Sequence, residues 1–595
     1  MGSLAVVRLR SAPPEPEKVR EMLAAAPHRG TTFDVLVSGD VALGVATTPD
    51  RLEDAWLASE DGTAAAFAGA LDNHAELKRA LADENVIVSG DDPASTVLAA
   101  FRAWGDAAPG RFRGMFTGAV SDARGLRLFR DHVGFHTLYY REDPRGFFAA
   151  TEAKQVLAGT GLAREPNLEG LEILLFNGSA VPLRGLERFP STSLGVVDER
   201  GKVSFSLYWD PSALVETARV TVAEASERVG ELLEQAVRRC LTGTDAVTLS
   251  GGLDSPSDAA FAAPRHLELS GKPLVAVSAV YPDYPAVDES SYIELVSQRL
   301  GLELHTFVPT ANSLDDVELW VTLLDAPVMT FSVPEAAESY RHAREHGAKV
   351  VLGGDLAEFV FALRYYFYGH LFLHGRWRAL ARHLRERHAR GHAWSSLLRG
   401  VVAESLPPVL AVQHARLRNR NPWQLPEWLE RTRGDAAGRF DRMAARRRFV
   451  QSQIDPTGRG GVSATLEANE ICAAYCGVHA RSPFADVDLW EFVLSLRAET
   501  KFPDRVTKRL VREAVNDRLP PEIVWRRDKT SFDDHVLATA EYPELERWIL
   551  RSPYRLPRVD YDLLARRIGR RELSVFELQK ARDLARIHAF LASCE

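Results

Sequence analysis

One short segment constrains this chain more than any other: an apolar strand that runs into a glycine-rich turn and then into a helix. Residues 246–249 have the apolar character of a buried strand, and the sequence SGGLDS follows directly at 250–255. A helical period is present over 221–241, and further strand-like runs occupy 274–280 and 349–352, each after a helical segment. This alternation predicts a parallel sheet wrapped by helices.

The composition of the turn suits an anion. Backbone N–H groups and the helix dipole favour negative charge where a strand gives way to a helix, and glycine lets the backbone approach a phosphate closely. Asp254 would repel bare phosphate, so it indicates a bridging Mg²⁺. The sequence has no Gly-x-x-x-x-Gly-Lys element here, which excludes a Walker loop. The residues predicted to line this nucleotide-phosphate site are Leu249, Ser250, Gly251, Gly252, Leu253, Asp254 and Ser255, with Gly354 from a later loop.

The first third of the chain has a different pattern of expected strands and helices. Residues 1–210 read mainly as short strands bounded by Gly and Asp turns, with helices expected near 74–84 and 94–104. This pattern predicts a layered α+β domain. The helical periodicity begins after Tyr208-Trp209-Asp210-Pro211, and 595 residues exceed one ordinary core, so we place a second domain at 211–595.

The net charge of the chain limits the classes of function that it can have. The chain carries 73 Lys+Arg and 81 Asp+Glu, a net charge of −8, which argues against a general nucleic-acid binder. No apolar run approaches the ~20 residues of a membrane span, and the first residues lack the order of a signal peptide, so we expect a soluble, cytoplasmic protein.

Residues 364–448 stand apart, because they hold 18 Arg, no Lys and six Asp+Glu, a local charge of +12. One interpretation is a set of helices with solvated arginine faces; the other is a basic surface for an acidic or phosphate-bearing ligand.

The cysteines are too few and scattered for a disulfide framework. Cys472 and Cys476 have the spacing that puts two side chains on one helix face, with His479 nearby. Reduced core thiols are the favoured interpretation, and a metal site is the alternative.

Several further segments of the chain occur in an order that is typical of one family. With the SGGLDS turn, they resemble the asparagine synthetase branch of the ATP-pyrophosphatase superfamily over nearly the whole chain. The resemblance is carried by His28-Arg29-Gly30, Asp131-His132-Val133-Gly134, Leu138-Tyr139-Tyr140, Thr151-Glu152-Ala153-Lys154, Tyr208-Trp209, Ala480-Arg481-Ser482-Pro483-Phe484, Leu519-Pro520-Pro521-Glu522-Ile523 and Arg527-Asp528-Lys529-Thr530-Ser531-Phe532.

The resemblance implies a fold and a chemistry. Residues 1–210 would form a glutaminase-like sandwich of the N-terminal-nucleophile (Ntn) hydrolase type. Residues 211–595 would form an α/β ATP-pyrophosphatase domain with a helical insert at 364–448. ATP and Mg²⁺ are the implied cofactors, and activation of a carboxylate as its acyl-adenylate is the implied activity.

The departures from the family refine this expectation. A working glutaminase of the family has Cys immediately after the initiator Met, activated by its own α-amine. This chain has Gly2, and Ser3 would serve only after removal of two residues. The segment that aligns with the family's glutamine-binding Asn-Gly-Glu reads Ala68-Gly69-Ala70. We therefore expect an inactive glutaminase-like domain.

Members without this nucleophile include β-lactam and carbapenam synthetases and lasso-peptide cyclases. β-Lactam synthetases carry a Tyr–Glu pair where this chain has Asp355 and His479, which disfavours that branch. The favoured prediction is a lasso-peptide isopeptide cyclase, a macrolactam synthetase that joins an Asp or Glu side chain of a leader-free core peptide to its N-terminal amine. The alternative is a β-lactam-type or ammonia-dependent asparagine-type synthetase.

The resemblance also implies roles for single residues. Asp254 and Glu358 would hold Mg²⁺, and Lys529 would face the adenylate and stabilise the oxyanion as the amine attacks. His479 and Asp355 are the candidate bases for that amine.

Two further matches carry less weight. Lys508 resembles a family lysine, but a solvated helix face is the favoured interpretation, and no catalytic role is assigned to Asp288-Glu289. The expected partners are the core peptide, a leader peptidase and a leader-recognition protein, without nucleic acid or membrane. The expected state is a monomer or weak homodimer.

Overall fold

The chain is described by a computed structural model over residues 1–49, 54–175, 180–327, 333–361, 367–406, 461–504, 506–527 and 530–595. In the N-terminal part the strands are β1 (Ser3–Leu9), β2 (Thr32–Ser38), β3 (Val41–Thr47), β4 (Ala55–Glu60), β5 (Thr63–Leu71), β6 (Gly114–Asp122), β7 (Gly125–Arg130), β8 (Tyr139–Asp143), β9 (Gly146–Ala150), β10 (Glu187–Arg188), β11 (Ser193–Val197) and β12 (Val203–Leu207). The helices are α1 (Pro16–Ala24), α2 (His74–Asp83), α3 (Pro93–Trp104), α4 (Ala153–Thr160) and α5 (Leu168–Leu175).

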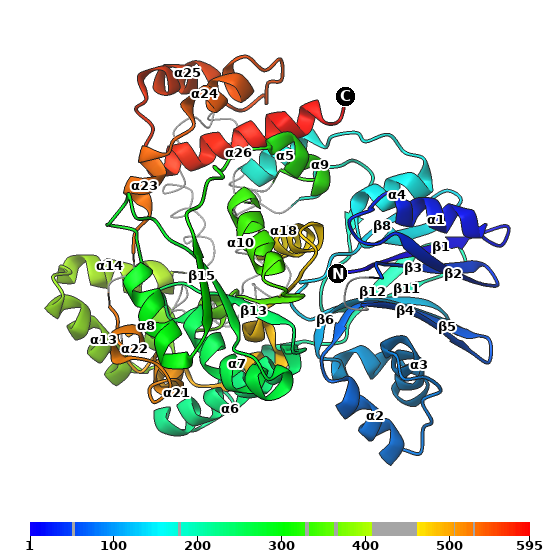
Figure 1. Ribbon diagram of the computed structural model, residues 1–595, viewed down its shortest axis with the longest axis horizontal. Helices are drawn as coiled ribbons and strands as arrows, with labels where there is room; N and C mark the ends of the chain where they lie inside the picture. The colour runs from blue at the N-terminus through cyan, green and yellow to red at the C-terminus, as the bar shows by residue number, and fades with distance from the viewer. Residues whose placement is uncertain are drawn as a thin grey trace.

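These strands form two facing antiparallel sheets. Their orders within the described residues are β10-β8-β9-β1-β3-β2 and β12-β11-β7-β6-β5-β4. Apolar side chains such as Leu4, Val6, Leu128 and Phe147 fill the space between the sheets. Helices α1 and α4 cover the outer face of the first sheet, while α2 and α3 pack on the second (Figure 1). The predicted layered α+β domain is confirmed.

The predicted helices near 74–84 and 94–104 correspond to α2 and α3. Helix α3 begins where the Asp92 carboxylate accepts a hydrogen bond from the Ser95 N–H (2.8 Å), a typical N-cap. Helices α1, α4 and α5 were not expected, because each is only eight or nine residues long and shows little periodicity on its own.

The second half is built on a parallel sheet with the strand order β15-β14-β13-β16-β17. The strands are β13 (Asp245–Thr248), β14 (Val275–Ala279), β15 (Glu303–Phe307), β16 (Val350–Leu352) and β17 (His479–Arg481). The helices around and beyond the sheet are α6 (Val222–Cys240), α7 (Asp254–Ser270), α8 (Ser290–Leu300), α9 (Val317–Leu323), α10 (Val333–Glu345), α11 (Ala357–Phe361), α18 (Gly461–Tyr475), α19 (Val487–Ser495), α20 (Ala498–Lys501), α21 (Arg509–Ala514), α22 (Pro521–Val524), α23 (Asp533–Ala538), α24 (Tyr542–Leu545), α25 (Tyr561–Arg570) and α26 (Val575–Ala592).

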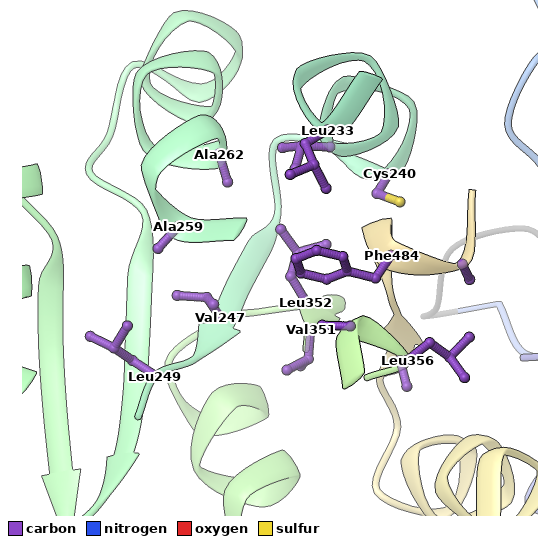
Figure 2. Packing of buried hydrophobic residues seen from close by; sticks show 14 of the residues in the cluster. Leu233, Cys240, Val247, Leu249, Ala259, Ala262, Val351, Leu352, Leu356 and Phe484 are labelled. Carbon is purple, nitrogen blue, oxygen red and sulfur yellow. The ribbon is translucent and has the colours of Figure 1, made fainter. Parts of the chain in front are cut away.

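Helix α6 shows how the sequence specifies this half. Thr221 and Glu224 form a reciprocal capping box at its start. Its apolar residues are buried at helical spacing and pack with α7 onto β13 and β16, as Figure 2 shows for Leu233, Val247 and Leu352. The predicted helix at 221–241, the strands at 274–280 and 349–352, and the parallel sheet are therefore confirmed.

The arginine-rich region predicted as a helical insert is described in part. Helices α12 (Phe367–Leu373), α13 (Trp377–Ala389) and α14 (Trp394–Ser405) belong to it, whereas residues 364–366 and 407–448 lie outside the described residues. Helix α26 runs back toward the N-terminal domain (Figure 1), where the Lys580 ammonium donates to the Leu175 carbonyl (2.9 Å). In the part of the chain that the structure describes, no helix is long and apolar enough to cross a membrane.

Candidate functional site

The glycine-rich turn leaves the carboxyl end of β13 and enters α7. The Ser255 hydroxyl accepts a hydrogen bond from the Ser250 N–H (3.0 Å), and the Ser250 hydroxyl accepts one from the Gly252 N–H (3.3 Å). The turn thus closes on itself directly in front of a 17-residue helix whose positive end faces it. The predicted place of the turn, between a strand end and a helix start, is confirmed, and phosphate binding there stays a prediction.

A second layer of polar groups holds the turn from outside. The Glu289 carboxylate accepts from the Gly251 N–H (3.0 Å), and Arg526 donates to the Gly251 carbonyl (2.7 Å) and to Glu289 (2.8 Å). A Cβ on Gly251 would lie 2.8 Å from the Glu289 Cβ, so only glycine allows this approach. Glu289, to which the sequence assigned no role, is therefore an anchor of the turn.

Lys529 and Asp528 lie outside the described residues, so the adenylate-facing role of Lys529 stays a prediction. The next described residue, Thr530, contacts Glu289, which anchors the turn. The Thr530 hydroxyl donates to Glu289 (2.7 Å) and accepts from Arg526 (2.6 Å).

Asp254 and Glu358 meet around one lysine. The Lys508 ammonium donates a hydrogen bond to Asp254 Oδ2 and lies 3.9 Å from Glu358 Oε1. The Lys508 side chain is only 11% exposed, which excludes the solvated-helix interpretation of this residue. Two carboxylates beside a phosphate-binding turn are a donor set that Mg²⁺ accepts together with nucleotide oxygens. The residues present thus fit the predicted cation.

Asp355 lies on the loop that follows β16. Its carboxylate accepts a hydrogen bond from the Asn469 amide (2.9 Å), and its own carbonyl accepts one from the Ser482 hydroxyl (2.7 Å). The surrounding protein withdraws the carboxyl from bulk water and raises its pKa to about 6; the Asn469 bond opposes this rise, and the charge of Asp254 adds to it. The residue is nevertheless accessible to solvent, as a proton acceptor must be.

The two loops touch at Gly354. A Cβ there would lie 2.7 Å from the Asp254 Cβ and 3.0 Å from the Ser255 nitrogen. The next residues complete a tight turn, in which Leu356 has a positive φ of 69° although it is not glycine. Backbone in this conformation costs energy and concentrates at functional sites.

His479 lies elsewhere. It begins β17, its N–H donates to the Lys349 carbonyl (2.8 Å), and its ring nitrogen lies 3.1 Å from Asp54 of the N-terminal domain. The phosphate-binding turn is at the opposite, carboxyl edge of the sheet. The structure thus groups His479 with Asp54 at the boundary between the domains, and this placement does not favour the base role that the sequence suggested.

Asp258 was missed from the sequence. It lies one turn after Asp254 on α7 and is 1% exposed, and neither of its carboxylate oxygens has a hydrogen-bond partner among the described residues. Burial raises its pKa well above the ordinary value, and the charges of Asp254 and Asp355 add to the rise. The signal was a single carboxylate in a stretch of small and apolar residues, 256–263.

Cys472 and Cys476 are free thiols, and Cys472 is fully buried. No cluster of three or more His, Cys, Asp or Glu residues suited to a metal occurs among the described residues. These observations agree with the interpretation of the two cysteines as core thiols.

The position that would hold the glutaminase nucleophile is filled by backbone. Gly2 is buried, and its N–H donates to Asp54 Oδ2 (2.6 Å). A Cβ at this position would lie 2.7 Å from the Ala46 carbonyl oxygen and 2.9 Å from the Ala55 Cβ. The neighbouring Ser3 hydroxyl accepts a hydrogen bond from Gln155 (3.1 Å). This packing leaves no room for a side chain at residue 2.

A glycine-rich turn at the carboxyl edge of a parallel sheet, with two carboxylates and a lysine beside it, is an arrangement suited to the phosphates of a nucleotide. The chain matches the family model "Asparagine synthase" over residues 228–590 and the model "Glutamine amidotransferase domain" over residues 1–209. It therefore belongs to the asparagine synthase family. The class of reaction follows from the family: it is an ATP-dependent amide-forming ligase that produces AMP and pyrophosphate.

Individual relatives are distant. The chain is 24% identical over 520 residues to Asparagine synthetase [glutamine-hydrolyzing] 3 of Bacillus subtilis (strain 168), covering 80% of this chain and 77% of that protein. Among solved structures, the glutamine phosphoribosylpyrophosphate amidotransferase of B. subtilis complexed with ADP and GMP is 12% identical, covers 60% of this chain and 81% of that chain, and has a TM-score of 0.27.

Proposed function

We propose that this ligase is a lasso-peptide cyclase. It would adenylate the side-chain carboxyl of an Asp or Glu in a leader-free core peptide and join it to the N-terminal amine of the same peptide. The observation that carries this proposal is the packing at Gly2, which leaves no space for a nucleophile that could release ammonia from glutamine. The nitrogen must then arrive with another substrate, and a peptide that contains both groups supplies it.

The first half of the reaction uses the turn and the paired carboxylates. A carboxylate oxygen of the peptide attacks the α-phosphorus of ATP, the bond to the β-phosphate oxygen breaks, and pyrophosphate leaves. The backbone of residues 250–255 is arranged to hold the leaving phosphates, with Lys508 beside them. Asp254 and Glu358 would hold Mg²⁺, which neutralises charge on the leaving pyrophosphate when it is bound.

The second half forms the amide. The N-terminal amine attacks the acyl carbon, AMP leaves with both bonding electrons of the C–O bond, and the amine loses a proton. Asp355 suits the last step, because its carboxylate is held by Asn469 and has a pKa raised to about 6. Lys529 is proposed to stabilise the charge on the departing AMP.

Two small-molecule alternatives remain: a β-lactam-type synthetase and an ammonia-dependent asparagine-type synthetase. The relative named above favours the second, since it is an asparagine synthetase at 24% identity. Against the first stands Asp355 at the position where the β-lactam branch has tyrosine. The basic helix α13 and the exposed side chains of Trp377 and Trp394 suit a peptide better than a single amino acid.

The test offers the purified full chain a panel of synthetic peptides with a free N-terminal amine and one Asp or Glu at successive positions. We expect AMP, pyrophosphate and a product lighter by one water with at least one peptide, and no product lighter by one water with its N-acetylated control. AMP formation from aspartate and ammonium salt, with no product from any peptide, would instead support the asparagine-type alternative.

We propose partners, an oligomeric state and a location on the same grounds. A leader peptidase and a leader-recognition protein would prepare the core peptide, and the enzyme would act as a monomer or weak homodimer without nucleic acid or membrane. We place it in the cytoplasm, where ATP is available and thiols such as those of Cys240 and Cys472 stay reduced.

A further inference from the structure

Helix α18 lies between the N-terminal domain and the candidate ligase site (Figure 1). Its turn from Glu467 to Glu470 contains two glutamates and an asparagine that are each at most 5% exposed. The glutamates are three residues apart and so share a face of the helix, while Asn469 points in another direction. Buried polar groups of this kind need partners, and these come from both sides of the helix.

On the side of the N-terminal domain, both glutamates are held by buried arginines. Arg29 donates two parallel hydrogen bonds to Glu470, one of them at 2.6 Å, and neither side chain is exposed. Arg130 donates to Glu467 (2.6 Å), and Arg188 lies 3.1 Å from the same carboxylate. Forked arginine–carboxylate pairs fix orientation as well as distance. They therefore fix the rotation of α18 about its axis and its position along that axis.

On the other side, Asn469 reaches the ligase site. Its amide nitrogen donates to the Asp355 carboxylate (2.9 Å), and its amide oxygen accepts from the buried Tyr340 hydroxyl of α10. The amide therefore has a set orientation, with the NH₂ group toward Asp355. One helical turn thus connects arginines of the first domain to the carboxylate that we placed at the amide-forming step.

We infer that Arg29 is a positioning residue of the ligase site: the N-terminal domain holds α18 through the Arg29–Glu470 pair, and α18 in turn orients Asp355 through Asn469. The first domain therefore serves the second as a scaffold, although it has no room for a nucleophile. The inference rests on the proposed role of Asp355 for its effect on turnover. Its structural part is independent of the substrate.

The test compares Arg29→Lys, Asn469→Ala and the double variant in the full chain. Lysine keeps the charge of Arg29 but cannot make the forked contact with Glu470. Arg113→Lys is the matched control, because Arg113 also pairs across the domains, with Asp488 at 2.8 Å, but it reaches α19 instead of α18. Glu470→Gln is made in parallel, so that the conclusion stands if Arg29→Lys fails to fold.

The first readout is amide hydrogen exchange, which needs no substrate. We expect exchange in residues 353–361 to rise about tenfold in Arg29→Lys, Glu470→Gln and Asn469→Ala, with no further rise in the double variant. Unchanged exchange in the α18 variants, or an equal rise in Arg113→Lys, overturns the inference. A double variant whose effect is the product of the single effects also overturns it.

The second readout is turnover of whichever peptide the panel identifies. We expect kcat to fall about tenfold in Arg29→Lys while the KM for MgATP stays unchanged, because Glu289 and Arg526 hold the phosphate turn independently of α18. A higher KM for MgATP with unchanged kcat contradicts the inference. If no peptide turns over, the proposed function fails, and the exchange measurements still decide the scaffold role.

Discussion

Gly354 offers the sharpest test of how the two loops of the site depend on each other. A Cβ added there would lie 2.7 Å from the Asp254 Cβ, 3.0 Å from the Ser255 nitrogen and 3.1 Å from the Asp254 carbonyl carbon. Ordinary carbon contacts are about 3.5–4.0 Å, so the Gly354→Ala variant must separate the loops by about 1 Å. The neighbours are backbone and Cβ atoms, which cannot rotate away.

A displacement of about 1 Å at a reacting centre costs about 100-fold in rate, which is about 2.7 kcal/mol of transition-state stabilisation. We expect Gly354→Ala to lose at least this much in pyrophosphate release and to bind MgATP more weakly in calorimetry. Gly353→Ala is the matched control, because its Cβ would meet only Asp355 Oδ2 at 3.4 Å and Thr248 Oγ1 at 3.6 Å. Wild-type MgATP affinity and rate in Gly354→Ala, or an equal loss in Gly353→Ala, would refute the reasoning.

Three further predictions concern single carboxylates. Asp254→Asn should lower pyrophosphate release by about 100-fold or more, because a charge that holds the cation is lost; undiminished release would exclude its metal role. Asp258→Asn should raise the free energy of unfolding by about 1–3 kcal/mol. This gain should grow from pH 5 to pH 8, because burial raises the pKa of Asp258 and ionisation of its carboxyl opposes folding. A gain that shrinks as pH rises would contradict this prediction. Glu216 is partly buried, which alone would raise its pKa, but hydrogen bonds from His370 (2.9 Å) and Arg376 (2.5 Å) lower the pKa to about 2. Glu216→Gln should therefore cost about 2–3 kcal/mol at pH 7 in denaturant unfolding, and this cost should diminish as pH falls from about 4.5 toward 2.

The parts of the site that could be predicted are local in the sequence. The turn at 250–255 contains its strand end, its glycines and its helix start within one short stretch, and hydrogen bonds within that stretch close it. Asp254 and Glu358 were paired by the resemblance to the family, and Lys508 contacts both in the structure. The parallel sheet followed from the alternation of helices and strands.

The parts that could not be predicted depend on contacts between distant segments. Asn469 lies 114 residues beyond Asp355, and no local pattern marks it as the partner of that carboxylate. Glu289 and Arg526 anchor the turn from distant segments, and nothing in those segments indicates that their side chains meet at Gly251. His479 was placed beside Asp355 by alignment, but the direction of its side chain depends on the packing of the domain boundary, where Asp54 receives it.

In the proposed reaction, this ligase activates a carboxylate of a peptide as an acyl-adenylate. The most direct measurement uses a peptide from the panel whose Asp or Glu side-chain carboxylate is labelled with ¹⁸O, with mass spectrometry of the nucleotide and phosphate products. Because a carboxylate oxygen attacks the α-phosphorus and leaves with AMP, the account predicts one ¹⁸O in AMP for each ring formed and none in pyrophosphate. Ring formation with unlabelled AMP, or with ADP and labelled phosphate, would contradict it.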